Sequence, residues 1–197
     1  MPKIVDHEQR RREIAEAVYW IAAADGVAAV SMRRVATELG LSLGAVQHYF
    51  ASRDEMLDFA SSDLGRRRER RVRRGLLRLG RFPRERDILR LPAEAGLPLD
   101  EERRLECLAE AAFLGQMISG DATGREGIRT LLGFFESLLR AAEDRGALAP
   151  DVDPKLEARM LWAILSSQAQ GVLAGIAEPD EVVAGLDYWF DRVLPQR

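Results

Sequence analysis

The sequence has very few of the residue types on which most enzymes and disulfide-stabilised proteins depend. Its 197 residues include one cysteine, Cys107, and two histidines, His7 and His48. An intrachain disulfide is therefore excluded, and a histidine-based metal site is poorly supplied. A cysteine pair, His-Glu-x-x-His, Gly-x-Ser-x-Gly and a phosphate-binding loop are all missing. The sequence predicts neither a metal nor a cofactor, and an enzyme stays open only if carboxylates converge in a cavity.

Long hydrophobic stretches are also missing. No apolar run approaches the roughly 20 residues that a membrane-spanning helix needs, and the first residues contain no apolar core of a signal peptide. The composition, 47% hydrophobic and 31% charged, is that of an ordinary folded protein. We therefore expect a cytoplasmic protein without a membrane partner.

Charge is distributed unevenly along the chain. The net charge of -3 combines +6 over residues 1–90 with -9 over residues 91–197, and residues 1–54 are neutral. Much of the basic excess is an arginine run at 66–74. On one continuous helix this run begins roughly 20 Å beyond Arg53. We interpret it as an exposed face paired with acidic neighbours, and direct DNA contact is the less favoured alternative.

Apolar residues recur at helical spacing nearly throughout, and no stretch alternates between apolar and polar residues. This pattern predicts an all-α fold of about nine helices. A capping box at Ser52–Glu55 predicts the start of a long helix, whereas residues 91–98, with two prolines, are predicted to be a connection. In the last two helices, the predicted inward-facing residues are Met160, Ile164, Leu165, Val172 and Leu173, followed by Val182, Leu186, Trp189, Phe190 and Val193.

The first three short helices have the spacing of a helix-turn-helix. Ala36 is small where two helices touch, Gly40 can adopt the positive φ of the turn, and Val46 anchors the second helix. A tight helical corner in a bundle is the alternative. The residues on the exposed side of the second helix favour the helix-turn-helix, because they include few strong helix formers and would suit a merely solvated helix badly.

Several of these residues have the chemistry that DNA recognition needs. Gln47 can pair with an adenine edge through two hydrogen bonds. Arg33, Arg34 and Arg53 can face phosphates, and the helix start at Ser42 adds backbone donors.

Residues 10–59, about a quarter of the chain, resemble the N-terminal DNA-binding domain of TetR-type transcriptional regulators. The resemblance lies in SMRRVA at 31–36, LGLSLG at 39–44 and HYFASRDEML at 48–57. It implies a homodimer that reads a palindromic operator in the major groove. Gln47 stands where the family usually has tyrosine, and Arg53 where it usually has lysine. The implied DNA contacts are Arg33, Leu43, Gly44 and Gln47 near bases, and Ser42, His48, Tyr49 and Arg53 near phosphates.

The rest of the chain is less diagnostic. Residues 97–106 and the C-terminal end look like the BetI-like branch of the family. We expect a DNA-binding domain at 1–52 and a ligand-binding and dimerisation domain at 53–197. The candidate ligand-binding residues are Phe113, Met117, Phe134, Phe135, Trp162, Leu165 and Gln168, although most such residues at helical spacing are simply core. The candidate dimer-interface residues are Ser167, Gly171, Gly175, Leu186 and Trp189, with an intrachain helix contact as the alternative.

These expectations define one function and one alternative. The sequence predicts a transcriptional regulator that binds double-stranded operator DNA as a homodimer and is released by a small-molecule effector of unknown identity. The alternative is a helical ligand- or partner-binding protein without operator recognition.

Overall fold

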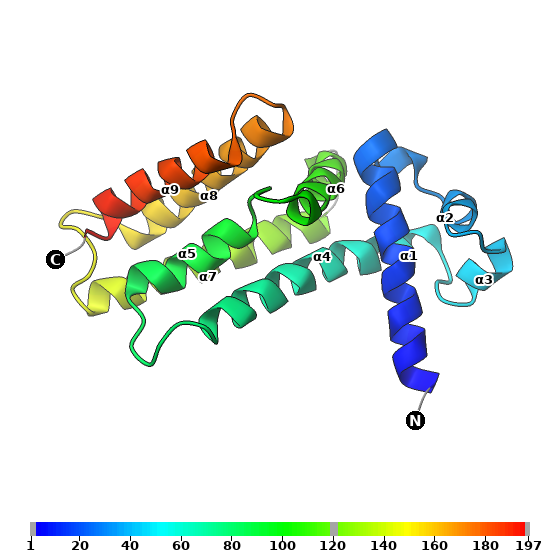
Figure 1. Cartoon of the computed structure of the whole chain (residues 1–197), viewed down its shortest axis with the longest axis horizontal. Coiled ribbons are helices and arrows are strands. Elements are labelled where there is room, and N and C mark those ends of the chain that lie inside the picture. Colours follow the sequence, from blue (N-terminus) through cyan, green and yellow to red (C-terminus); the bar gives the residue numbers. More distant parts are fainter. Residues whose placement is uncertain (1–2, 119–121, 196–197) are drawn as a thin grey trace. The chain divides into compact units, whose positions relative to one another are not determined.

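The structure, a computed structural model, describes the backbone of residues 3–118 and 122–195 and the side chains of residues 7–114 and 126–195. Over these ranges it contains nine α-helices, one 3-10 turn and no strand, which confirms the all-α prediction (Figure 1). The elements are α1 (Lys3–Asp25), η1 (Val27–Ala29), α2 (Met32–Glu38), α3 (Leu43–Gln47), α4 (Arg53–Leu76), α5 (Glu85–Ala95), α6 (Glu101–Ile118), α7 (Ala122–Asp144), α8 (Pro154–Leu173) and α9 (Pro179–Val193).

The chain packs as two compact units, each with its own hydrophobic core. The boundary differs from the predicted division after residue 52, because Met56, Ala60 and Leu64 of α4 are buried in the first core. Helices α4 and α6 contribute residues to both units. The first unit is Met1–Arg67 with Leu105–Gly120, and the second is Arg68–Arg104 with Asp121–Arg197.

Helix α1 forms the centre of the first unit, as its apolar periodicity predicts. Ile14, Val18 and Ile21 are at most 2% exposed. Val35 of α2 and Val46 of α3 are fully buried in the same core. This core fixes the positions of the two short helices, which are too short to be stable by themselves.

The start of α4 shows half of the predicted capping box. Ser52 Oγ accepts the Glu55 backbone N–H at 3.1 Å, as expected. The Glu55 carboxylate instead accepts the N–H of Ala51 at 2.7 Å, one residue earlier than a capping box requires. Its other oxygen binds Arg11 of α1 at 3.0 Å. The carboxylate therefore connects the α3–α4 turn to α1.

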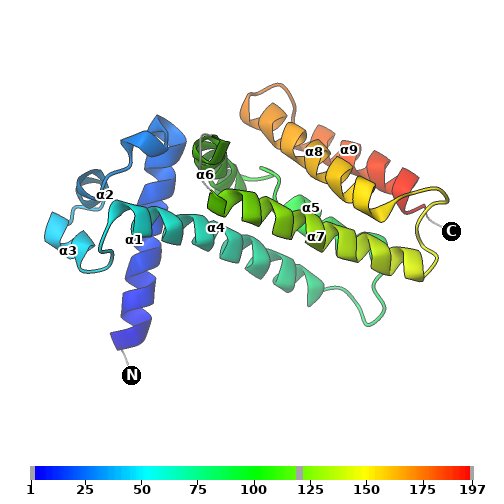
Figure 2. The same ribbon diagram turned by 180° about the vertical axis from the view of Figure 1, so that it is seen from behind.

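The second unit is built around α7, α8 and α9, which lie close together in both views (Figure 1, Figure 2). The predicted inward face of α9, namely Val182, Leu186, Trp189, Phe190 and Val193, is buried. The prediction for Met160 of α8 is wrong, because its side chain is 55% exposed. Met160 points to a different side of α8 from Leu161 and Leu165, which are buried.

The predicted connection at residues 91–98 is helical up to Ala95, so the prediction is wrong for its first five residues. Pro92 lies inside α5 and is buried with Leu89 and Ala93. The apolar face that these residues form packs in the second core. Burial on this scale offsets the backbone hydrogen bond that an internal proline removes.

Candidate nucleic-acid interface

The turn between α2 and α3 has the geometry predicted for a helix-turn-helix. Gly40 adopts a φ of +63°, a left-handed conformation that glycine tolerates best. The N–H of Leu41 donates to the carbonyl of Ala36 at 2.8 Å, and that of Gly40 to the carbonyl of Thr37 at 3.1 Å. This pair of bonds closes α2 and directs the chain into α3.

Serine hydroxyls begin both helices. Ser31 Oγ accepts the N–H of Arg34 and Ser42 Oγ accepts the N–H of Ala45, each at 3.1 Å. A hydroxyl that accepts one hydrogen bond still has a proton to donate. Ser42 can therefore cap α3 and donate to a phosphate oxygen at the same time.

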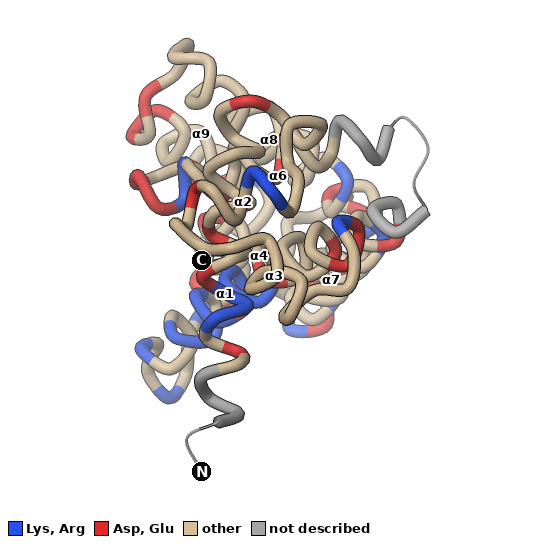
Figure 3. Tube along the Cα trace, turned by 90° about the vertical axis from the view of Figure 1, so that its right-hand side faces the viewer, with Lys and Arg blue, Asp and Glu red and all other residues tan. Residues whose placement is uncertain are grey.

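The outer side of α3 is exposed and uncharged. Gly44, Gln47 and His48 are exposed, and Leu43 is half-buried. Figure 3 shows no basic or acidic residue in the α3 trace and a basic stretch in α2. Such a surface can approach base edges closely without placing a carboxylate against DNA.

The two arginines of α2 differ in their contacts. Arg34 binds Asp25 at 2.7 Å. Arg33 is exposed and forms no ion pair with any residue that the structure describes. Arg33 is therefore the cation of this helix that is available for DNA.

An aromatic cluster beside α3 contains a residue that sequence reasoning missed. The Tyr49 ring lies 4.8 Å from the His7 ring and 5.1 Å from the His48 ring, measured between centroids. His7 belongs to α1, so α1 supports the predicted contact residues His48 and Tyr49. No local pattern in the sequence marks this contact, because His7 and Tyr49 lie far apart along the chain.

Arg53 has a different environment from the one predicted. Its Nε donates to the Val30 carbonyl at 2.6 Å and one Nη to the Val27 carbonyl at 2.7 Å, and its other Nη lies 3.7 Å from Asp54. The side chain is half-buried. These contacts give Arg53 an internal role, because they attach the η1 turn, and with it the start of α2, to α4. Its predicted phosphate contact stays a prediction.

A buried polar cluster holds α4 against α1 below this surface. The Tyr19 hydroxyl donates toward the Ala60 carbonyl and Asp63 Oδ2, each at 3.1 Å, and Asp63 also accepts from Arg67 at 2.9 Å. Arg67 reaches Glu16 at 2.7 Å. Burial, followed by the Asp63 charge, raises the pKa of Tyr19 far above its ordinary value. Burial opposes the charge of Arg67, but its hydrogen bonds to Glu16 and Asp63 outweigh this and raise its pKa.

The arginine run at 66–74 shows the predicted pairing in part. Arg66 binds Asp63 at 3.4 Å, and Arg71 lies 3.9 Å from Glu102 and donates to the Ala95 carbonyl. The guanidinium groups of Arg66 and Arg71 are therefore bound to residues of the same unit.

The candidate ligand-binding residues do not form one described site. Phe113 packs with the core of the first unit, whereas Phe135 and Leu165 belong to the core of the second. Gln168 Nε2 lies 3.3 Å from the point where a Cβ on Gly185 of α9 would stand. Phe134 is 44% exposed, Trp162 is half-buried, and the Met117 side chain lies outside the described residues.

Two of the candidate dimer-interface residues belong to the core of their own unit. Leu186 and Trp189 are 1% and 6% exposed, and the Trp189 indole donates to Glu157 at 3.1 Å. They have no surface to offer a second copy, so this part of the prediction is wrong.

The small residues of α8 have separate roles. Gly175, at φ +69°, terminates α8, where the N–H of Ile176 donates to the Gly171 carbonyl at 2.8 Å. A Cβ on Gly171 would lie 3.5 Å from Ala177 of the same chain. Ser167 and Gly175 are the exposed members of the predicted stripe, and Gly171 is half-buried.

Among the residues that the structure describes, no three His, Cys, Asp or Glu side chains lie together in a group that could hold a metal ion. Nor is any of the described helices long and apolar enough to cross a membrane.

Comparisons with known proteins agree with this geometry. Residues 21–59 match the family model "Bacterial regulatory proteins, tetR family". The HTH-type transcriptional regulator PksA of Bacillus subtilis (strain 168) is 31% identical over 176 residues, which cover 86% of this chain and 81% of PksA.

Solved structures show the same fold. A transcriptional regulator from Rhodococcus sp. Rha1 is 26% identical, with a TM-score of 0.74 over 90% of this chain and 92% of that one. A transcriptional regulator from Saccharomonospora viridis, crystallised in complex with choline, is 19% identical, with a TM-score of 0.81 over 96% of this chain and all of that one.

Proposed function

Because this chain belongs to the TetR family of bacterial regulatory proteins, we propose that it is a repressor that binds a palindromic operator as a homodimer and is released by a small-molecule effector. As a family member it is a DNA-binding transcriptional regulator and not an enzyme. The observation that carries the proposal is the exposed, uncharged α3, capped by Ser42 and held on a rigid core.

The proposal assigns a role to each exposed residue of this surface. Gln47 and Arg33 read base edges, and Leu43 and Gly44 allow α3 to enter the major groove. The Ser42 hydroxyl, His48 and Tyr49 contact phosphates, with His7 supporting the two rings. Arg53 acts indirectly, because its guanidinium holds the η1 turn.

An operator titration tests this proposal. Labelled duplexes from the DNA flanking the protein's own gene are titrated by fluorescence anisotropy beside scrambled duplexes of the same composition. We expect preferential binding of one duplex at moderate salt. Arg33→Ala and Gln47→Ala should each lower specific binding by about 1–3 kcal/mol, while Gln170→Ala, at an exposed position of α8, should not. Equal binding of native and scrambled duplexes would favour the alternative, a helical binding protein without an operator.

The homodimer is proposed to form through the outer faces of α8 and α9. Leu156 and Met160 of α8 are 57% and 55% exposed, Ile176 is 82% exposed, and Tyr188 of α9 is 65% exposed. These side chains, with Ser167, lie away from the core of the unit. Large exposed apolar side chains on α8, on α9 and in the turn between them favour an interface, and a twofold axis would bury the same surface of both copies.

Sedimentation equilibrium tests the interface. We expect a dimer at micromolar concentration and a monomer for Met160→Glu combined with Tyr188→Glu, because the buried carboxylates would lack partners. Leu77→Glu, at an exposed apolar residue next to α4, is the matched control and should remain dimeric. A wild-type monomer contradicts this part of the proposal.

Effector binding is proposed to act through residues 53–197 by changing the spacing of the two DNA-binding surfaces, since half-sites on DNA require one fixed separation. The complex of a similarly folded regulator with choline supports a small-molecule effector. A regulator of this kind works in the cytoplasm, where its operator is. The resemblance to the BetI-like branch stays a prediction and specifies no effector.

A further inference from the structure

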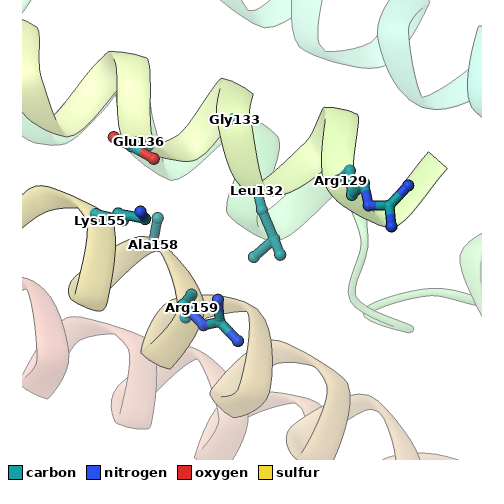
Figure 4. Close-up of a pocket in the computed structure, with 7 residues that line it drawn as sticks. All are labelled: Arg129, Leu132, Gly133, Glu136, Lys155, Ala158 and Arg159. Carbon is teal, nitrogen blue, oxygen red and sulfur yellow. The ribbon is translucent and has the colours of Figure 1, made fainter. Parts of the chain in front are cut away.

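A groove on the second unit runs between α7 and α8 (Figure 4). It has a volume of about 190 Å³ and is partly open to solvent. None of the residues that line it was a candidate in the sequence. The lining consists of Arg129, Leu132, Gly133 and Glu136 from α7 and of Lys155, Ala158 and Arg159 from α8.

The groove exists because its floor is made of small or apolar residues. Gly133 has no side chain, and a Cβ added there would meet nothing within 4 Å. Ala158, 1% exposed, and Leu132 supply an apolar base where the two helices meet. A ligand that enters the groove therefore meets hydrocarbon at the bottom.

The rim of the groove is basic. Lys155 and Arg159 form no ion pair within the described part of the chain, and Arg129 has only a 3.4 Å contact with the exposed Glu126. The labelled cationic groups come from both helices (Figure 4). The site thus combines three cations with a single carboxylate, Glu136.

Three carboxylates of α7 and of the start of α8 form hydrogen bonds to groups other than these cationic side chains. Glu136 Oε1 accepts two hydrogen bonds from Arg140, at 3.0 and 2.8 Å. Asp153 accepts the backbone N–H groups of Lys155 and Leu156 as the cap of α8. Glu157 accepts from the Trp189 indole at 3.1 Å. Each of these carboxylates thus forms at least one hydrogen bond to a group other than the side chain of Lys155 or Arg159.

Two features of α8 favour an anion beside Lys155 and Arg159. Lys155 and Arg159 are four residues apart on one helix, a spacing at which like charges repel. Lys155 also lies in the first turn of α8, where the helix dipole disfavours a cation. A bound anion would relieve both effects at once.

We propose that the α7–α8 groove binds a small organic carboxylate, whose anionic group is held by Lys155 and Arg159 and whose apolar body covers Leu132 and Ala158. A carboxylate fits better than a dianionic phosphate, because the Glu136 carboxylate lines the same groove. The inference deepens the effector-responsive function proposed above and rests on it for its regulatory meaning.

Isothermal titration of the full-length protein with three probes of similar shape tests the charge preference. Benzoate is the anion, benzamide its neutral analogue and benzylammonium the cationic one. We expect benzoate to bind at least about tenfold more tightly than benzamide, as charge-assisted hydrogen bonds require, and benzylammonium not to bind. Equal affinities for benzoate and benzamide, or no benzoate binding up to about 10 mM, overturn the proposal.

Two pairs of variants locate the binding. Arg159→Gln should weaken benzoate binding about tenfold, whereas Arg145→Gln, at an exposed arginine that does not line the groove, should not. Gly133→Leu fills the groove and should abolish binding, whereas Gly127→Leu, at another open position of α7, should preserve it. Identical effects within either pair would place the binding elsewhere. The titration contains no DNA, so its failure and that of the operator experiment are distinguishable.

Discussion

In the first unit, Arg11, Arg53 and Arg67 bind groups of the same unit, whereas in the second, Lys155 and Arg159 line a groove without an ion pair among the described residues. The basic excess of the sequence lies in residues 1–90. Some of the arginines that make up this excess hold the helices and turns of the first unit together. The net charge of a segment therefore does not locate its binding sites, because a cation in an internal ion pair and a cation available to a ligand count equally.

The largest effect is expected when the buried Asp63 carboxylate of the first unit is removed. Asp63→Ala leaves the Arg67 guanidinium without its buried partner, so we expect a loss of about 3 kcal/mol in the free energy of unfolding. Urea denaturation of the full chain measures it. Asp58→Ala, at an exposed position of the same helix, serves as the control and should stay within about 0.5 kcal/mol of wild type. Equal stabilities of the two variants would show that the cluster does not hold α4 to α1.

The second test separates an engaged arginine from an available one. Arg53→Ala removes hydrogen bonds to the Val30 and Val27 carbonyls and should lower the free energy of unfolding by about 1.5–3 kcal/mol. Arg33→Ala should leave stability within about 0.5 kcal/mol and weaken operator binding instead. Urea denaturation and anisotropy, applied to both variants, give the comparison. If Arg53→Ala weakens DNA binding without changing stability, the result would support a direct contact between Arg53 and a DNA phosphate.

The third test uses the raised pKa of Tyr19. The folded chain keeps the hydroxyl proton of Tyr19 above pH 10, whereas the unfolded chain releases it near the ordinary value of 10.0. The unfolded state then binds one proton fewer, so Tyr19 makes stability fall by about 1.4 kcal/mol per pH unit above pH 10. Tyr19→Phe should make the decline shallower by that amount. Denaturation at several pH values measures the slope, and identical slopes would show that the hydroxyl is not desolvated.

Local signals in the sequence predicted the elements of the interface well. The caps at Ser31 and Ser42 and the turn at Gly40 each depend on residues within six positions of one another, so spacing alone identifies them. The apolar face of α9 was predicted for the same reason.

Contacts over long sequence distances could not be predicted in this way. The carbonyls that bind Arg53 lie 23 and 26 residues before it, and no local pattern marks them. His7 meets Tyr49 only because α1 and α3 share a core. Helical periodicity also does not show whether an apolar face packs against its own chain or against a second copy. For this reason the sequence could not show that Leu186 and Trp189 belong to the core of their own unit.

The smallest expected effect contrasts two glycines, one in each unit. Gly40 provides a left-handed turn, so Gly40→Ala should destabilise the protein by about 1–2 kcal/mol although its Cβ has room. Gly133 lies inside α7 without positive φ and with open space around it, so Gly133→Ala should stabilise by about 0.5–1 kcal/mol. Thermal unfolding of both variants measures the pair. A loss of stability in Gly133→Ala would mean that Gly133 is needed for the packing of α7. A gain would mean that stability does not require this glycine, as we expect if it keeps the groove open for a ligand.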